Sequence, residues 1–490
     1  MTKSLFKEKK TKLEDTLRYL FSFVSFFGNS DHTTNNTFPG LSDYFQRTTS
    51  IAPLVVYRIL FGAVMFASII RFISKGWVYD LYIKPKFYFS YFGFEWIKPL
   101  GATGMYIVFG SLALLALLVM AGLFYRFSIA SFFLLFTYVE LIDKTNYLNH
   151  YYFVSIVSFL LILVPANKYF SLDAWFYPKI KTKWVPQWSI DIFKFQIAIV
   201  YLYAGLAKLN YDWLFRAMPL RIWLPAQNDF PLLGPLFEYT WIAFAFSWFG
   251  AVYDLTIPFL LINKRTRPFG FFLVLVFHLL TVSLFQIGMF PYIMILGSLI
   301  FFSADFHKKI ISFLSKAFPA NDKTSRESDT YPSAPSLVKP SFPQKLILGI
   351  LVFHFALQIL IPLRFLLYPG KLFWTEQGYR FSWRVMLMEK AGVAFFYVKD
   401  KTTGDEWEVT NRDFLTINQE KMVATQPDMI LQFAKYLKEY YQKQGIENPE
   451  VRAKTFVTLN GRASRPIVDE TIDLALEKES LKHKNWVTSF

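Results

Sequence analysis

The chain has 490 residues, of which 54% are hydrophobic, 20% aromatic and only 18% charged, and it contains no cysteine. So apolar a chain is typical of a polytopic helical membrane protein rather than a soluble one, and the missing cysteine excludes disulfides, thiolate metal sites and a cysteine nucleophile. The net charge of +16 fits basic cytosolic loops better than nucleic-acid binding, because no basic stripe marks a soluble part of the sequence.

The first 50 residues are basic, and charges interrupt their apolar part. We expect residues 1–50 to be a cytosolic amphipathic segment lying on the membrane rather than a cleaved signal. The following apolar segments are each candidates for a spanning helix of about 20 residues. They cover residues 51–74, 103–124, 127–142, 151–165, 191–208, 239–262, 268–287, 289–303 and 345–367. Residues 51–369 are therefore predicted to form an all-α polytopic bundle of about nine transmembrane helices.

The distribution of Lys and Arg predicts the orientation of this bundle. With nine spans, the basic segments all fall on one face: the N-terminus, loop 166–190, the loop NKRTR at 263–267, and the Ser- and Pro-rich stretch 304–344, which we expect to be flexible. The positive-inside rule places that face in the cytosol. The N-terminus would then be cytosolic, and the aromatic loop 75–102, expected to be partly buried at the interface, would lie outside with the C-terminal residues 370–490.

Residues 370–490 predict a small extracytosolic α+β domain. The stretch GVAFFYVKDKTTGDEWEVT, residues 392–410, alternates around a polar turn that contains glycine, as a β-hairpin does. The stretch TQPDMILQFAKYLKEYYQKQG predicts an amphipathic helix with Thr425 as its N-cap and Gly445 at its end. VRAKTFVTLNGRASRP adds a strand and an Asn460-Gly461 turn.

The first polar stretch at membrane depth is LIDKTNYLNHYYF, residues 141–153. It carries Asp143, Lys144, Asn146, Asn149 and His150 between two apolar segments. A solvated loop is one interpretation. The connection is too short to leave the membrane far, however, so its polar groups are expected to pack into protein or line a wet cavity.

The second stretch is YLYAGLAKLNYDW, residues 201–213, in which Lys208 stands at the outer end of a predicted span. A snorkelling anchor is one interpretation of this lysine. The other is a buried amine, because a lysine among apolar groups loses affinity for its proton and is able to act as a general base. The small residues Ala204, Gly205 and Ala207 come just before Lys208 in the chain.

The third stretch, FHLLTVSLFQIGMFPY at 277–292, places His278 within a span. A lone histidine there is more often hydrogen-bonded packing than a ligand. Asp254 and Arg267 are further charges in or near spans, and we expect that they can pair. No His or carboxylate pair has metal-ligand spacing, so no metal is expected. The sequence also lacks a P-loop, a dinucleotide fingerprint and a G-x-S-x-G elbow.

The fourth stretch, WTEQGYRFSWRVMLMEKAG at 374–392, follows the last span. Its aromatic and basic residues, among them Tyr379, Trp383 and Arg384, are those of a membrane belt. They would equally suit the closure of a site between the membrane and the outer domain.

These four stretches, in this order, resemble the vitamin K-dependent γ-glutamyl carboxylase family and its bacterial relatives with a horizontally transferred transmembrane domain, over roughly residues 50–475. The resemblance implies a peptidyl-glutamate 4-carboxylase with coupled vitamin K epoxidation. In such enzymes reduced vitamin K (phylloquinone or menaquinone hydroquinone) is deprotonated and attacked by O2. The resulting base removes a γ-proton from a glutamate-containing peptide or protein, and the carbanion adds CO2. The expected partners are the lipid bilayer and that substrate, and no nucleic acid.

The resemblance also assigns residues. Lys208 falls on the initiating base of the family, and Asn149 and His150 fall on an Asn–His pair expected at the quinone oxygens and the reacting centre. Those three are the predicted catalytic residues. The small residues Ala204, Gly205 and Ala207 would then leave room beside the Lys208 amine for the flat quinone ring. The predicted cofactor-binding residues are His278, which falls on another motif histidine, with Tyr379, Trp383, Arg384 and Tyr211.

Three alternatives stay open at this point. The region after the β-module is shorter than the luminal region of the animal enzymes, which helps to engage a substrate propeptide, so a quinone epoxidase without protein carboxylation is one alternative. A second alternative is a membrane protein that binds a quinone or lipid without turnover. A transporter would need internal repeats or charges spread through its core, whereas the polar groups here gather at one face.

Overall fold

The computed structural model describes residues 47–285, 287–317 and 342–490. The predicted N-terminal segment, up to residue 46, lies outside the described residues, as does most of the stretch 304–344. The part of that stretch that is described forms a helix, α15 (Ala304–Ala317), so flexibility was the wrong expectation there.

Seven described helices are long and apolar enough to cross a membrane. They are α3 (Ala52–Ser74), α5 (Gly101–Ala121), α6 (Tyr125–Ile142), α9 (Trp188–Lys208), α12 (Thr240–Ile262), α13 (Arg267–Leu284) and α16 (Phe342–Leu363), which η6 (Arg364–Leu367) extends. An eighth span results if α14 (Phe290–Ser298) and η5 (Leu299–Phe301) are joined to α15 across a bend of 117°. The helix α7 (Asn149–Leu163) is apolar but shorter. The predicted membrane bundle is confirmed, with seven or eight spans by length and composition in place of about nine.

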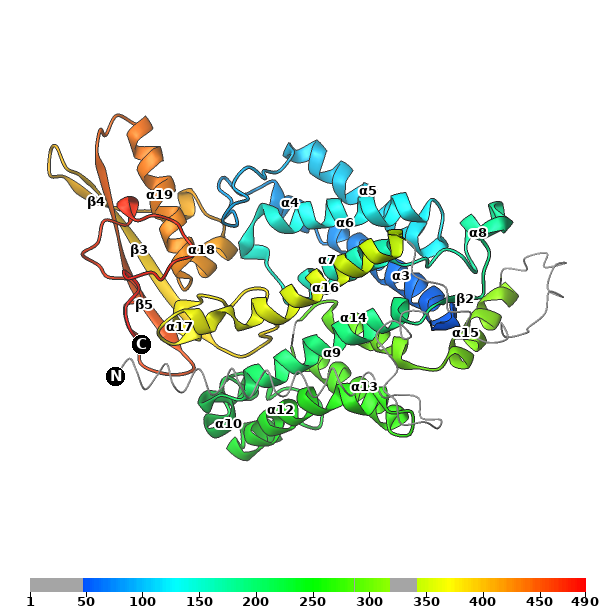
Figure 1. The fold of residues 1–490 in the computed structure, drawn as a ribbon. Coiled ribbons are helices and arrows are strands. Elements are labelled where there is room, and N and C mark those ends of the chain that lie inside the picture. The colour runs from blue at the N-terminus through cyan, green and yellow to red at the C-terminus, as the bar shows by residue number, and fades with distance from the viewer. Residues whose placement is uncertain (1–46, 286, 318–341) are drawn as a thin grey trace.

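Helix α9 is the most enclosed of these spans. In its most apolar stretch 78% of the residues are buried, against 22–50% in the other spans. Figure 1 shows α9, α12 and α13 together on one side of the bundle and α3, α5, α6 and α7 on the other. Gly205 sets how closely α9 meets α12, because a Cβ atom there would lie 2.8 Å from the Leu255 side chain. The small residue therefore brings two helices together, whereas the sequence had suggested that it leaves room for a ring.

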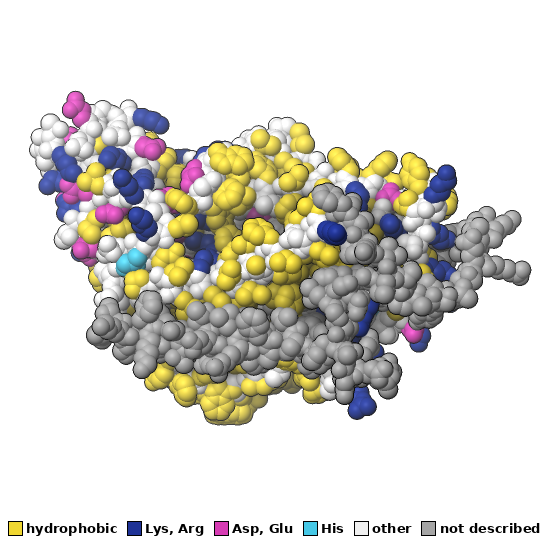
Figure 2. All heavy atoms as spheres, viewed as in Figure 1, with side chains coloured by type: hydrophobic (Ala, Val, Ile, Leu, Met, Phe, Trp, Pro, Cys, Tyr) yellow, Lys and Arg dark blue, Asp and Glu magenta, His cyan; other side chains and the backbone are white. Residues whose placement is uncertain are grey.

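Short elements connect the spans. They are α4 (Trp77–Tyr82), η1 (Lys144–Asn146), α8 (Leu172–Phe176), α10 (Tyr211–Arg216), α11 (Leu220–Trp223), α17 (Leu372–Thr375) and a two-stranded ribbon of β1 (Thr48–Ser50) and β2 (Trp184–Pro186). Figure 2 shows hydrophobic side chains over the helical part, whereas charged side chains gather on the soluble domain and at the opposite end of the bundle.

The soluble domain is a three-stranded antiparallel sheet covered by two helices. The strands β3 (Lys390–Asp400), β4 (Glu406–Val409) and β5 (Pro449–Leu459) have the order β4-β3-β5, and the helices are α18 (Ile417–Val423) and α19 (Pro427–Lys443). Alternate strand residues such as Phe396 and Val398 are buried against α19. The predicted hairpin, helix and third strand are confirmed, and Asn460 and Gly461 both have positive φ, as the predicted turn needs. Thr425 is not the N-cap, since the helix starts after Gln426 without a side-chain cap.

The soluble domain is packed against the bundle through the loop that follows α3 and α4. Phe89 of this loop belongs to the buried core of the soluble domain, and its carbonyl accepts a hydrogen bond from the backbone of Lys144. The Gln419 side chain of α18 donates to Phe87 O at 2.7 Å and to Asp143 Oδ2 at 2.9 Å. The loop predicted to be partly buried therefore joins the two parts of the molecule.

Candidate active site between the bundle and the soluble domain

Two adjoining cavities lie near the junction with the soluble domain, one inside the bundle and one between the bundle and that domain. The first, here called the apolar cavity, has a volume of about 300 Å³ and is lined by α9, α12, α13, α14 and residues 385–386. Most of its lining is aliphatic or aromatic, and the ionisable or hydrogen-bonding exceptions are Tyr201, Lys208, Asp254, His278 and Thr281. This mixture of an apolar wall with a few convergent polar groups is typical of small-molecule sites.

Lys208 lies in the apolar cavity as half of a buried ion pair. Its Nζ is 2.5 Å from Asp254 Oδ2, and the two residues are 5% and 4% exposed. Lys208 Nζ also lies 3.5 Å from Ala204 O and 5.3 Å from the ring centre of Trp213. The structure thus favours a buried amine over a snorkelling anchor, and it gives that amine a carboxylate partner.

Sequence reasoning did not assign Asp254 to the site. It stands on α12, 46 residues after Lys208 in the chain, so no local spacing pairs the two. The other intramembrane charge considered with it, Arg267, donates instead to the backbone carbonyls of Leu261 and Ile262 at 2.8 and 2.9 Å. The only available signal was the cost of an unpaired acid within a span, which calls for a basic partner.

His278 brings the third polar group to the apolar cavity. Its Nε2 lies 3.0 Å from the Tyr201 hydroxyl, whereas its Nδ1 is buried with no hydrogen-bond partner. A buried polar atom without a partner is uncommon and marks a place where a ligand or water can bind. The Tyr201 hydroxyl therefore fixes the orientation of the His278 ring, and Nδ1 of that ring stays available to a ligand.

The second cavity, here called the polar cavity, has a volume of about 1140 Å³ and lies beneath the soluble domain. Its lining includes the predicted site residues Asn149, His150, Tyr379 and Arg384. Of the residues that the structure describes, five lysines and arginines line it, namely Arg71, Lys75, Lys144, Arg380 and Arg384, together with one acid, Glu376. Glu376 is already paired with Lys390 at 2.9 Å. The cavity therefore carries an excess of positive charge.

Among the described basic residues that line the polar cavity and have no carboxylate partner, Arg384 is the most enclosed. It is 8% exposed, its Nε has no hydrogen-bond partner, and its guanidinium lies 4.4 Å from the ring centre of Phe365. Its backbone carbonyl accepts from Asn149 Nδ2 at 3.0 Å and from the Tyr379 hydroxyl at 3.3 Å. Three predicted residues thus meet here, and Asn149 positions the chain that carries the arginine.

Phe290 separates the two cavities. Its ring centre lies 6.0 Å from that of His150, in the polar cavity, and 5.7 Å from that of His278, in the apolar cavity. Phe285, Phe290, Val385 and Met386 line both cavities. The sequence had grouped Lys208, Asn149 and His150 at one centre, whereas the structure divides them between two adjoining spaces.

The segment that follows α17 forms the common wall and has an unusual backbone. Glu376, Phe381, Trp383 and Met386 all have φ between 54° and 58°, a conformation that costs on the order of 1–3 kcal/mol for residues with a side chain. Gly378, with φ of 90°, is required because a Cβ atom would lie 2.8 Å from Phe365 Cα. Such strain persists only where the surroundings impose it, as they do at functional sites.

Two predicted cofactor-binding residues line neither cavity. Trp383 is 1% exposed and stacks on Tyr152 with ring centres 4.9 Å apart, so it supports the wall from behind. Tyr211 begins the short helix α10 and is 67% exposed. Both were predicted because they stand in the stretches that carry the family resemblance, and position in such a stretch does not distinguish a wall residue from a packing residue.

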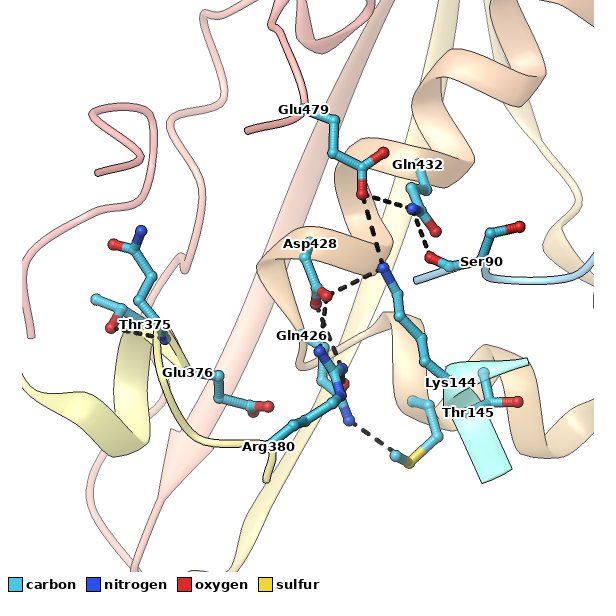
Figure 3. A network of polar contacts seen from close by, with 12 residues as sticks. Ser90, Lys144, Thr145, Thr375, Glu376, Arg380, Gln426, Asp428, Gln432 and Glu479 are labelled. Carbon is cyan, nitrogen blue, oxygen red and sulfur yellow. Dashed lines mark hydrogen bonds and ion pairs between the residues drawn. The ribbon is translucent and has the colours of Figure 1, made fainter. Parts of the chain in front are cut away.

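A polar network ties the wall to the soluble domain (Figure 3). Asp428 at the start of α19 accepts from Lys144 at 3.0 Å and from Arg380 at 2.7 Å. Glu479 lies 4.0 Å from Lys144 and accepts from Gln432 at 2.6 Å. Burial would raise the pKa of the Asp428 carboxyl, but Arg380 and Lys144 hold that pKa well below its usual range. Lys144 and Arg380 are therefore neutralised, whereas Arg384 is not.

A metal centre finds no support in the described ranges. No group of three or more His, Cys, Asp or Glu side chains there is arranged to hold a metal ion. The ionisable groups of both cavities are available for acid–base chemistry and for binding anions.

Fold and site together define an integral membrane protein with a lumenal-type C-terminal domain, in which a buried lysine–carboxylate pair adjoins a cationic cavity. Residues 46–306 match the family model of the HTTM domain, and residues 343–490 match that of the vitamin K-dependent gamma-carboxylase, lumenal domain. The chain belongs to the vitamin K-dependent gamma-carboxylase family, as the four sequence stretches had indicated. The comparison with solved structures gave no significant match.

Proposed function

We propose that this protein is a vitamin K hydroquinone-dependent γ-glutamyl carboxylase in which the two cavities have separate tasks. The apolar cavity would bind the reduced naphthoquinone, and the polar cavity would bind the glutamate side chain. The observation that carries the proposal is the partition at Phe290, with Lys208 and His278 on one side and His150 and Arg384 on the other.

The residues of the apolar cavity fit a reduced naphthoquinone. Its volume of about 300 Å³ is at the lower end of small-molecule sites, and Phe246 and Phe249 offer apolar surface for a flat ring. Lys208 and the unpartnered Nδ1 of His278 are polar groups that suit the oxygens of such a ligand. When bound, reduced vitamin K together with O2 would supply the strong base that a γ-proton requires and would leave as its epoxide.

Lys208 would start the reaction by taking a proton from a phenolic hydroxyl, whose ordinary pKa is about 10. Its burial keeps water away from the amine. Exclusion of water matters because an oxygen-derived base would otherwise be quenched before it met its substrate. His278 would hold the second oxygen through Nδ1, since Tyr201 already occupies Nε2.

The polar cavity would hold the glutamate carboxylate by charge. Arg384 and Arg71 have no carboxylate partner among the described residues, and an arginine–carboxylate pair is among the stronger hydrogen-bonded contacts. His150 stands against Phe290 at the boundary, which would place it beside the carbon that loses its proton. CO2 would enter as a co-substrate.

We further propose that the short helix α7 and the bent α14–α15 pair also cross the membrane, because nine spans place the basic loops on one face. The soluble domain would then lie outside the cytosol, and the N-terminus would be cytosolic. A peptide substrate would then reach the polar cavity from the side of the soluble domain. A volume of about 1140 Å³ is ample for a side chain with its flanking backbone.

A quinone epoxidase without protein carboxylation is the second candidate. One observation favours it: Lys208, Asp254 and His278 all lie in the apolar cavity, so oxygenation needs nothing from the polar cavity.

The test uses purified protein in detergent with reduced vitamin K, O2, labelled CO2 and a glutamate-containing peptide. Epoxide and peptide-bound label are measured separately. Both products are expected from the wild type. Epoxide without label would establish the second candidate, and quinone binding without either product would identify a binding protein. A wild type that forms no epoxide would contradict both enzyme proposals.

A further inference from the structure

We infer that Asp254 is the proton acceptor behind Lys208, so that the two side chains act as one acid–base unit. Lys208 would face the ligand and Asp254 would store the proton. The inference deepens the proposed function and rests on it. It assigns a positioning and proton-accepting role to a residue that acts through Lys208.

Within the apolar cavity, Lys208 and Asp254 are each other's main polar partner. Among the described residues that line the apolar cavity, Asp254 is the only acid, and its Oδ2 accepts from Lys208 Nζ at 2.5 Å. Apart from the distant contact to Ala204 O at 3.5 Å, no other hydrogen bond of this amine is formed within the described part of the chain. The carboxylate is therefore the one group placed to take a proton from Lys208.

One glycine makes this contact possible. Gly205 lets α9 approach α12, as described above. The lysine side chain then passes beside Gly250, which lies four residues before Asp254 on α12. A Cβ atom at Gly250 would come 3.8 Å from Lys208 Cε and 3.6 Å from the Trp213 ring, which is ordinary van der Waals contact.

Stability alone is a weak reason for such a pair. Removing two charges from water costs several kcal/mol per ion, and apolar residues of similar size often stabilise a fold as well or better. Another buried pair, Lys390–Glu376, has a clear structural role, because it links the strained wall segment to strand β3. Helices α9 and α12 already pack closely through Gly205 and Leu255 and need no such tie.

The proton balance explains what the pair would contribute. Lys208 Nζ hands one proton to Asp254 Oδ2 and takes one from a phenolic hydroxyl in the cavity, and the O–H bonding electrons stay on the ligand oxygen. Before this step the cavity holds an ammonium, a carboxylate and a neutral ligand. Afterwards it holds an ammonium, a neutral carboxylic acid and a ligand anion. The net charge stays zero, so no uncompensated charge arises in a dry space.

The same exchange leaves Lys208 charged beside the new anion. The ammonium that faced Asp254 would then stabilise the ligand oxygen, which a cation in a water-poor site does strongly. A lone lysine would have to lose its proton to solvent before each turnover. The pair removes that requirement, because the proton has an acceptor 2.5 Å away.

Asp254→Asn tests the inference in the full-length protein. Asparagine keeps the shape and a hydrogen-bond acceptor for Lys208 but cannot take a proton. We expect kcat for epoxide formation to fall by about 100-fold or more, the usual range for loss of acid–base catalysis, while KM for reduced vitamin K changes little. Asp254→Glu, which restores a carboxylate, should recover part of kcat. A purely structural carboxylate would not produce this division between kcat and KM.

The matched control is Asp191→Asn, which removes another Lys–Asp pair of α9, with Lys194 Nζ 3.0 Å from Asp191 Oδ1. It should leave kcat unchanged, because that pair lies at the other end of the helix.

Thermal unfolding provides a readout that does not depend on activity. Asp254→Asn should lower Tm because it leaves a buried ammonium without a carboxylate, and Lys208→Met combined with Asp254→Leu should restore Tm. An Asp254→Asn variant with the wild-type Tm would contradict the claim that Lys208 and Asp254 form an ion pair. If Asp254→Asn does not fold, Asp254→Glu and the double variant carry the comparison.

Two outcomes separate this inference from the proposed function. An active wild type with an Asp254→Asn variant of equal kcat would overturn the role of Asp254 alone. A wild type that forms no epoxide would overturn the proposed function and this inference together.

Discussion

The apolar cavity and the polar cavity share four lining residues and are otherwise built in opposite ways. The apolar cavity lies inside the bundle, where α9 and α12 pack through Gly205, and its charges cancel within one pair. The polar cavity lies between the bundle and the soluble domain, and it keeps unneutralised arginines. The first arrangement suits proton transfer without water, and the second suits capture of an anion.

The difference also predicts which changes act on which cavity. The apolar cavity depends on helix packing and on Lys208, whereas the polar cavity depends on docking of the soluble domain through Asp428 and on the strained wall. Substitutions on either side should therefore separate the two products, unless they remove the step on which both depend.

Lys208→Met should have the largest effect. It removes the proposed base while keeping the length of the side chain, so both products should fall by about 100-fold or more. Epoxide and peptide-bound label are measured together, with Lys194→Met on the same helix as the control. Retention of epoxide formation would show that Lys208 is not the base.

Arg384→Gln should act on the polar cavity alone. Loss of a charge-assisted hydrogen bond of about 1.5–3 kcal/mol should raise KM for the glutamate peptide by about 10- to 100-fold. Epoxide formation in the absence of peptide should not change. The exposed arginine Arg412 supplies the control variant Arg412→Gln, and an equal fall of both products in Arg384→Gln would disprove the division of tasks.

Asp428→Asn should loosen the frame of the polar cavity. It leaves Lys144 and Arg380 without their carboxylate, at an expected cost of about 2 kcal/mol in unfolding free energy for this partly buried group. Because the native pKa of Asp428 is held low, the stabilisation is present above the unfolded pKa of about 3.9 and is lost as the pH falls below it. The difference in Tm between the variant and the wild type should therefore be smaller near pH 3 than at pH 7. Glu406→Gln, at an exposed pair, is the control.

Phe290→Leu should weaken the separation between the two cavities while keeping an apolar side chain at that position. Replacing the ring with a smaller apolar side chain costs less than about 1.5 kcal/mol, so both products should persist. Fewer peptides should be carboxylated per epoxide formed, because the ring no longer stands between His150 and His278. An unchanged ratio would mean that the wall has no part in coupling.

Tyr211→Ala should have the smallest effect. The sequence predicted that Tyr211 binds the cofactor, but its ring is largely exposed and lines neither cavity. Surface substitutions usually change stability by less than about 0.5 kcal/mol, and both products should stay within about twofold of the wild type. A selective loss of epoxide formation would show that Tyr211 does take part in quinone binding.

Much of this molecule could be predicted from sequence. The spans, the hairpin and the α19 helix follow from hydrophobic periodicity, and Lys208, Asn149, His150 and His278 stand in recognisable motifs. What the sequence did not contain was pairing at a distance. Asp254 meets Lys208 because Gly205 lets α12 approach α9, and the placement of Phe290 depends on where α14 starts.

Local signals also failed where tertiary contacts override them. Thr425 precedes Pro427 as an N-cap would, yet the helix starts after Gln426. Apart from Gly378, the left-handed residues of 376–386 are not those that favour positive φ, so the form of the wall could not be expected. Trp383 stands among site residues in the chain, but its ring packs behind them.

The most direct test of the two-cavity account is to map where the quinone binds. A photoreactive naphthoquinone is irradiated with the full-length protein in detergent, and the labelled peptides are identified by mass spectrometry, with excess unmodified vitamin K as competitor. The account predicts competable labelling of apolar-cavity residues such as Phe249 and Met294. Labelling confined to polar-cavity residues such as Tyr147 and Met388 would contradict it.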